Sequence, residues 1–130
     1  MKVTNLDGIT SNWKPRGKAR ANCSQLHSKA RQILYNKFNN TLVLEEVAIY
    51  PQWRTILYLD FYIPLLNLAI EVNGEQHYKF IQQFHRSKIN FFHSRRRDIV
   101  KKEWCDTNNI TLITLNYNES EQEWENKLNG

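Results

Sequence analysis

The chain has 130 residues, and its 18 lysines and arginines outnumber its 13 aspartates and glutamates, which gives a net charge of +5 at pH 7. This length predicts one domain with a core that needs no disulfide or structural metal. No apolar run is long enough to cross a membrane, and the first residues are too polar for a signal peptide, so we predict a cytoplasmic protein without membrane contact.

The first 22 residues show neither helical nor strand periodicity. They contain Gly8, Pro15 and Gly17, and their second half is basic. We therefore predict a flexible basic arm over residues 1–22, followed by a single domain over residues 23–130. The arm residues expected to hold phosphates are Lys14, Arg16, Lys18 and Arg20.

A helical apolar period after the arm predicts a helix that is capped by Ser24 and ends near Phe38. Strand-like runs follow, separated by short turns at Pro51-Gln52 and Pro64–Asn67. We predict that these runs form a three-stranded meander over residues 41–50, 54–63 and 67–73.

The second half of the chain predicts a loop, a helix, a short apolar strand and a last helix over residues 74–92, 95–107, 110–115 and 119–128. Ser94 is the predicted cap of the first of these helices, which faces the core with Ile99, Val100 and Trp104. The near-continuous apolar strand is expected to be buried on both faces, parallel to a meander strand. The fold class is α/β, with a mixed four-stranded sheet flanked by helices.

Two carboxylates lie in adjacent apolar strands. A hairpin centred on Pro64–Asn67 pairs Ile63 with Leu68 and places Asp60 opposite Glu71. Facing like charges destabilise a sheet, and a carboxylate removed from water must be paired, protonated or bound to metal. The pair therefore predicts a Mg²⁺ site, with Mn²⁺ as a substitute. The alternative for either acid is a solvated edge position or half of an ion pair.

Further polar residues surround this pair. Glu45 or Glu46 can complete the cluster from the first strand, and Gly74 lets a substrate approach the backbone closely. His77 is a candidate general acid or base, although a hydrogen-bonded structural histidine is equally typical. Asp98 is either a site residue or a surface acid, among basic residues expected to hold phosphates, namely Arg95, Arg96, Arg97 and Lys101.

Three places in the sequence carry a resemblance to a known family. They are Asp60, then Glu71 with the run Val72-Asn73-Gly74-Glu75-Gln76-His77, and then Arg97-Asp98 in a helix before an apolar strand. Together they resemble the PD-(D/E)XK nuclease superfamily. The nearest branch contains the very-short-patch repair endonuclease and related phage homing endonucleases. The resemblance implies a restriction-endonuclease-like core and Mg²⁺-dependent cleavage of nucleic acid. It assigns the strand acids to Asp60 and Glu71 and the later helix acid to Asp98.

The chain departs from this pattern in three respects, one of which is that it lacks the zinc-binding cysteines and histidines of the repair enzyme. Asn73 stands where the superfamily has a lysine, so Gln76 and His77 become the candidates for water activation. The first helix lacks the acid of the repair branch and offers Gln25, His27 and Gln32.

We therefore expect a Mg²⁺-dependent DNA endonuclease of homing or mobile-element type that binds double-stranded DNA. It would act in the host cytoplasm if it is phage-encoded, and as a homodimer if its target site is long. The alternatives are an inactive nucleic-acid-binding module on the same fold and a nuclease for branched DNA or RNA.

Overall fold

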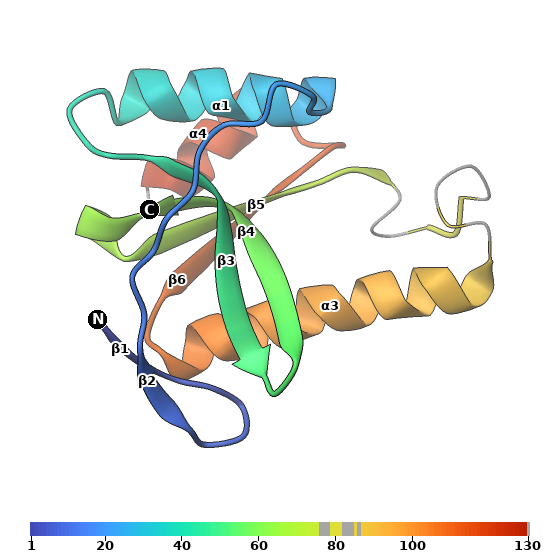
Figure 1. Cartoon of the computed structure of the whole chain (residues 1–130). Coiled ribbons are helices and arrows are strands. Elements are labelled where there is room, and N and C mark those ends of the chain that lie inside the picture. The colour runs from blue at the N-terminus through green and yellow to red at the C-terminus, as the bar shows by residue number, and fades with distance from the viewer. Residues whose placement is uncertain (76–78, 82–84, 86, 130) are drawn as a thin grey trace.

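The computed structural model describes residues 1–75, 79–81, 85 and 87–129. Within them the chain forms one four-stranded sheet, a separate two-stranded hairpin and three α-helices (Figure 1). In chain order the elements are β1 (Lys2–Thr4), β2 (Thr10–Asn12), α1 (Gln25–Lys37), β3 (Leu44–Gln52), β4 (Thr55–Ile63), the 3₁₀ turn η1 (Pro64–Leu66), β5 (Leu68–Asn73), α3 (Lys88–Thr107), β6 (Thr111–Asn116) and α4 (Glu121–Asn129).

The sheet has the order β3-β4-β5-β6, with the first three strands antiparallel and β6 parallel to β5. This confirms the predicted meander followed by a crossover helix and a parallel strand. The predicted burial of the last strand is wrong, however. Since β6 stands at the end of the strand order within the described residues, it is an edge strand and is mostly half-buried, whereas every residue of β5 is buried.

Helices cover both faces of the sheet (Figure 1). On one face, α3 packs Val100 and Trp104 against Val47 and Leu59 of the meander. On the other face, α1 and α4 pack Leu34 and Trp124 against side chains from β4, β5 and β6, which are Phe61, Ile63, Leu68, Ile70, Val72 and Leu115. The two cores explain why β5 is apolar on both sides.

The start of the chain is not a free arm. β1 and β2 pair as an antiparallel hairpin, and Val3 and Trp13 are buried in the α3-side core. The Trp13 indole N–H donates to the Ala48 carbonyl at 3.0 Å, and the Leu6 N–H donates to Pro51 at 2.8 Å, so this hairpin docks on β3. Further on, a Cβ on Gly17 would lie 2.0 Å from the Glu45 carbonyl oxygen, so only glycine fits this close approach.

Helix α3 begins seven residues earlier than predicted. Its cap is Ser87, whose hydroxyl accepts from the Asn90 N–H, whereas Ser94 lies inside the helix. Ile99, expected to face the core, is 49% exposed. The aromatic run before Ser94 concealed the helical period, because Phe91 packs on His85 instead of the main core. The β3–β4 turn also differs from the prediction, since Pro51 and Gln52 belong to β3 and the chain turns at Trp53 and Arg54.

A search of the described helices for a segment apolar enough and long enough to cross a membrane finds none.

Candidate active site

The β4–β5 hairpin has the predicted register. Its ladder pairs Ile63 with Leu68 and ends with Phe61 and Ile70, so the next two positions are Asp60 and Glu71. There the side chains replace the backbone ladder. The Asp60 N–H donates to Glu71 Oε2 at 2.7 Å, and the Val72 N–H donates to Asp60 Oδ2 at 2.8 Å. Each carboxylate is therefore held by the backbone of the opposite strand.

Burial and the neighbouring charge of Glu71 raise the pKa of Asp60 to about 7, although the hydrogen bond from Val72 and the charge of Lys101 oppose the shift. Asp60 Oδ1 accepts no hydrogen bond from the described residues. A carboxylate with one oxygen held in place and the other available is suited to bind a cation, which would offset the repulsion from Glu71.

Lys101 reaches Glu71 from helix α3. Its Nζ lies 2.7 Å from Glu71 Oε1, and the lysine side chain is only 15% exposed. Burial disfavours the charged amine, but the charge and hydrogen bond of Glu71 outweigh it, so the pKa of Lys101 is raised. Lys101 is therefore a fixed positive charge beside the acid pair, held by Glu71 and largely removed from the surface.

In both β3 and β4, the sheet face to which alternate side chains point changes next to the acid pair. Val47 and Leu59 belong to the α3-side core, whereas Phe61 lies in the opposite core and Glu45 contacts α1. The ladder pairs Glu45 with Phe61 and Val47 with Leu59, which leaves Glu46 opposite Asp60 at the reversal. Glu46 has a φ of 53°, a left-handed conformation that non-glycine residues rarely adopt and that clusters at functional sites.

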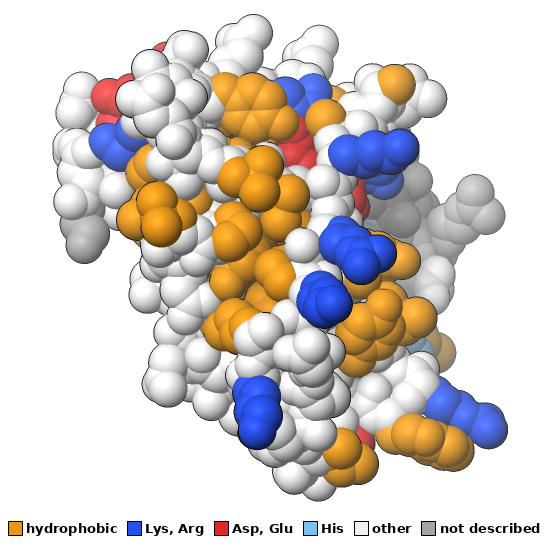
Figure 2. Space-filling view, turned by 60° about the vertical axis from the view of Figure 1, so that its left-hand side comes forward, with side chains coloured by type: hydrophobic (Ala, Val, Ile, Leu, Met, Phe, Trp, Pro, Cys, Tyr) orange, Lys and Arg blue, Asp and Glu red, His pale blue; other side chains and the backbone are white. Residues whose placement is uncertain are grey.

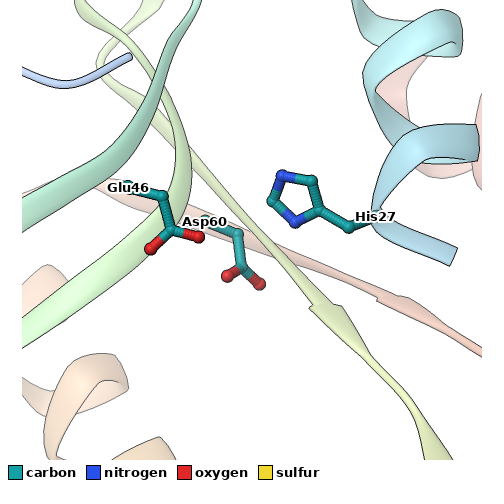
Figure 3. A group of neighbouring side chains, drawn as sticks. All are labelled: His27, Glu46 and Asp60. Carbon is teal, nitrogen blue, oxygen red and sulfur yellow. The ribbon is translucent and has the colours of Figure 1, made fainter. Parts of the chain in front are cut away.

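Three potential metal ligands converge at this reversal. His27 of α1, Glu46 of β3 and Asp60 of β4 each offer one atom, and these atoms lie within 4.8 Å of one another. Figure 3 shows the Glu46 and Asp60 carboxylates side by side, with the His27 ring directed toward them. Two carboxylates and an imidazole form a donor set that fits a divalent cation.

A second group of charged and polar residues, centred on Glu45, holds His27 in position. Its Nε2 lies 3.0 Å from Oε1 of Glu45, a residue that is 1% exposed. Glu45 also accepts hydrogen bonds from the Arg31 guanidinium, at 2.8 Å for the shortest, and from the Tyr35 hydroxyl. Burial alone would raise the pKa of Glu45, but the hydrogen bonds from Arg31, Tyr35 and His27 outweigh it and leave the pKa lowered.

The Asp60 side chain lines an open pocket of about 310 Å³ between the sheet and α3. Predicted residues meet there, since Glu46, Asp98 and Arg97 line the same pocket and Lys101 lies at its side. Arg20 also borders it, and its guanidinium lies 3.2 Å from Glu46. Glu71 lines a neighbouring pocket, which it shares with Asn73 and Asp98.

The other predicted residues that the structure describes lie outside this pocket. Lys14 and Arg16 line a separate hollow beside Trp13, Arg96 lines another, and Lys18 and Arg95 are exposed on the surface. Gly74 follows the end of β5 and is half-buried. Gln76 and His77 fall outside the described residues. Figure 2 shows lysine and arginine side chains projecting beside a band of apolar side chains on one face of the molecule.

Sequence reasoning missed two features of this site. It considered His27 only as a side chain on the first helix, and it assigned Lys101 to phosphate. A signal for His27 existed, because it is the third residue of a helix capped by Ser24, on the same face as the buried Ala30 and Leu34. A polar residue in such an apolar stripe requires a buried partner, which here is Glu45.

Comparisons with known proteins find relatives in viruses. The chain is 48% identical over 61 residues to "Uncharacterized protein 307L" of Invertebrate iridescent virus 6, a match that covers 47% of this chain and 31% of the relative. It is 38% identical over 61 residues to "Uncharacterized protein 033L" of Invertebrate iridescent virus 3, with the same coverage. It is 34% identical over 68 residues to "Uncharacterized protein 094L" of Frog virus 3, covering 52% of this chain and 44% of that protein.

The matched part of the chain thus spans less than half the length of each of these curated relatives. No family model matches the chain, and no solved structure matches it.

Proposed function

We propose that this protein is a metal-dependent nuclease that hydrolyses phosphodiester bonds in DNA, on a restriction-endonuclease-like core. The observation that carries the proposal is the convergence of Glu46, Asp60 and Glu71 with Lys101 beside one basic-rimmed pocket. Phosphodiester hydrolysis develops negative charge on phosphate oxygens, and this site gathers the groups that hold and neutralise such charge.

The acidic side chains would hold the cation. Glu46 and Asp60 supply carboxylate oxygens, and Glu71 lies next to them in a position fixed by the Asp60 N–H and Lys101. When bound, a divalent ion, with Mg²⁺ the first to test, supplies Lewis acidity and lowers the pKa of a coordinated water.

Lys101 favours an active nuclease over the alternative of an inactive nucleic-acid-binding module. That alternative rests on Asn73, which stands where the superfamily has lysine. In this fold an amine from α3 lies 2.7 Å from Glu71 Oε1, so a lysine reaches the acid pair from a different element. Because its pKa is raised, Lys101 stays protonated and would stabilise charge on the phosphate instead of removing a proton from water.

The rim of the pocket supports a nucleic-acid substrate. Arg20 and Arg97 flank Asp60, and neither side chain is buried. Exposed arginines bind phosphodiester backbones through charge and hydrogen bonds without selecting a sequence. The viral relatives accord with the expected mobile-element or virus-borne setting. We propose double-stranded DNA as the partner, and dimerisation where a long target site is recognised.

The test is a cleavage assay on supercoiled plasmid, linear duplex, branched DNA and RNA, with Mg²⁺, Mn²⁺ or EDTA. We expect metal-dependent DNA cleavage that Asp60→Asn and Glu71→Gln each reduce by roughly 100-fold or more. The control is Glu119→Gln, since Glu119 pairs with Lys127 of α4 instead of lining the pocket. Undiminished cleavage by Asp60→Asn would exclude this site. Salt-sensitive binding without any cleavage would favour the binding module, and preference for branched DNA or RNA would favour the structure-specific alternative.

A further inference from the structure

His27 belongs to the metal-ligand group and also contacts the buried carboxylate of Glu45. Its side chain is buried, at 7% exposed, and its ring stacks on Phe61 with the centroids 4.6 Å apart. Its Nε2 lies 3.0 Å from Glu45 Oε1. The imidazole is therefore held by a stacking contact and by a hydrogen bond, which fix both its position and its rotation.

The hydrogen bonds of Glu45 determine which ring nitrogen is available. Glu45 Oε1 already accepts from the Arg31 guanidinium at 2.9 Å, so it is an acceptor for the imidazole as well. His27 Nε2 must then carry the hydrogen, and in a neutral ring the lone pair lies on Nδ1. In Figure 3 the ring edge that carries Nδ1 faces Asp60. This arrangement, a carboxylate fixing one nitrogen while the other is available, is typical of histidines that bind metals.

Glu71 is less suited than His27 to complete the ligand set. Glu71 Oε2 accepts from the Asp60 N–H and Oε1 from Lys101, so both oxygens already have donors. Within the described residues no hydrogen bond engages His27 Nδ1, and one ring nitrogen of His27 belongs to the group within 4.8 Å. The ligand set is therefore mixed, with oxygen from β3 and β4 and nitrogen from α1.

We propose that His27 Nδ1, Glu46 and Asp60 together bind a first-row transition ion such as Mn²⁺ in preference to Mg²⁺, and that Glu45 is the positioning residue for His27. Imidazole nitrogen favours transition ions, whereas Mg²⁺ favours oxygen ligands and retains its waters. This names the ion of the proposed nuclease site, so its role in cleavage rests on the proposed function, but its binding is measurable without any substrate.

The decisive experiment is pulsed EPR of the full chain loaded with Mn²⁺ alone. A coordinated imidazole nitrogen gives a ¹⁴N coupling to the Mn²⁺ electron spin. We expect this coupling in the wild-type protein and in His93→Gln, a control at an exposed histidine of α3. We expect its loss in His27→Gln, in which the two carboxylates remain. Absence of the coupling in wild-type protein, or its persistence in His27→Gln, would overturn the proposal.

Calorimetric titrations with Mn²⁺ and Mg²⁺ test the preference. His27→Gln should weaken Mn²⁺ binding by about tenfold or more and Mg²⁺ binding much less, because only the transition ion gains from imidazole. Glu45→Gln should weaken Mn²⁺ binding by roughly 10- to 100-fold, the usual effect of losing a supporting partner. Circular dichroism checks the fold of each variant, and His27→Gln alone decides the proposal where Glu45→Gln does not fold. Equal loss of both ions in His27→Gln contradicts it.

The outcomes separate this inference from the proposed function. Nitrogen-coupled Mn²⁺ binding without DNA cleavage would refute the nuclease and leave the His27 site in place. Metal-dependent cleavage without nitrogen coupling would leave the nuclease in place and refute the His27 ligand.

Discussion

Asp60 and Glu71 lie opposite each other where the β4–β5 ladder ends, and each carboxylate accepts a backbone N–H from the opposite strand. The arrangement holds two acids together at the centre of the sheet. Lys101 offsets the charge of Glu71, but Asp60 remains an acid whose ionised form is disfavoured by burial and by its neighbour.

The raised pKa of Asp60 makes the stability of the metal-free protein depend on pH. The pKa of Asp60 is about 7 in the fold, against 3.8 for an ordinary aspartate. The folded state therefore binds this proton more tightly, so the contribution is complete below about pH 4 and is lost as the pH rises to about 7. Asp60→Asn should remove this part of the pH dependence, which we expect to amount to about 2 kcal/mol of unfolding free energy. The pKa shift by itself corresponds to a larger free energy, but solvent screens the partly exposed Asp60 side chain.

Urea unfolding of wild-type protein and Asp60→Asn in EDTA, between pH 4 and pH 8, measures this difference. The two proteins should differ most above pH 7, where the variant is the more stable. Parallel pH profiles would show that Asp60 ionises in the fold as it does in the unfolded chain.

Lys101 and Lys102 provide a matched pair of substitutions. Lys101 is 15% exposed and bound to Glu71, whereas Lys102 is 67% exposed and lies 3.6 Å from Asp106. Lys101→Met should reduce DNA cleavage by about 100-fold, since it removes a fixed positive charge from the site. Lys102→Met should leave the cleavage rate nearly unchanged. Cleavage rates under single-turnover conditions provide the comparison, and equal rates for the two variants would remove Lys101 from the site.

The buried Glu45 cluster should carry a large part of the stability. Arg31→Met leaves the fully buried Glu45 carboxylate without its main partner, and breaking such a pair costs about 3 kcal/mol or more. Arg20→Met breaks the more exposed pair with Glu46 and should cost less than about 1 kcal/mol. Because the pKa of Glu45 is lowered, its contribution is present at neutral pH and is lost on acidification.

Chemical denaturation at pH 7 measures both variants. Similar losses for Arg31→Met and Arg20→Met would mean that water reaches Glu45 and screens its charge.

Arg97 should contribute to DNA affinity through charge alone. It lies at the rim of the pocket, and its guanidinium donates to Ser94 at 3.0 Å, which directs it along α3. Arg97→Gln should weaken binding to all duplex sequences alike and lower the slope of log affinity against log salt by about one. Lys37→Gln is the control, because Lys37 contacts Asn129 at the far end of α1. Fluorescence anisotropy over a salt series measures both slopes, and an unchanged slope for Arg97→Gln would place the DNA elsewhere.

The main elements of the fold could be predicted from local signals. Ser24 caps α1 as expected, and the alternation of β4 and β5 about the Pro64–Asn67 turn gave the correct register. The errors have tertiary causes. The hairpin of β1 and β2 is ordered by docking on β3, and the first turns of α3 lack an apolar stripe because their aromatic residues pack locally.

The sequence by itself determined the facing acids, Asp60 and Glu71, because strand alternation and a short turn are local properties of the chain. Only the tertiary structure decided which groups surround them. Lys101 is 30 residues from Glu71 in the sequence, and the crossover of α3 brings their side chains together. His27 and Glu46 meet Asp60 because the side chains of β3 and β4 change from one core to the other at the same position. No local sequence pattern indicates where two cores meet.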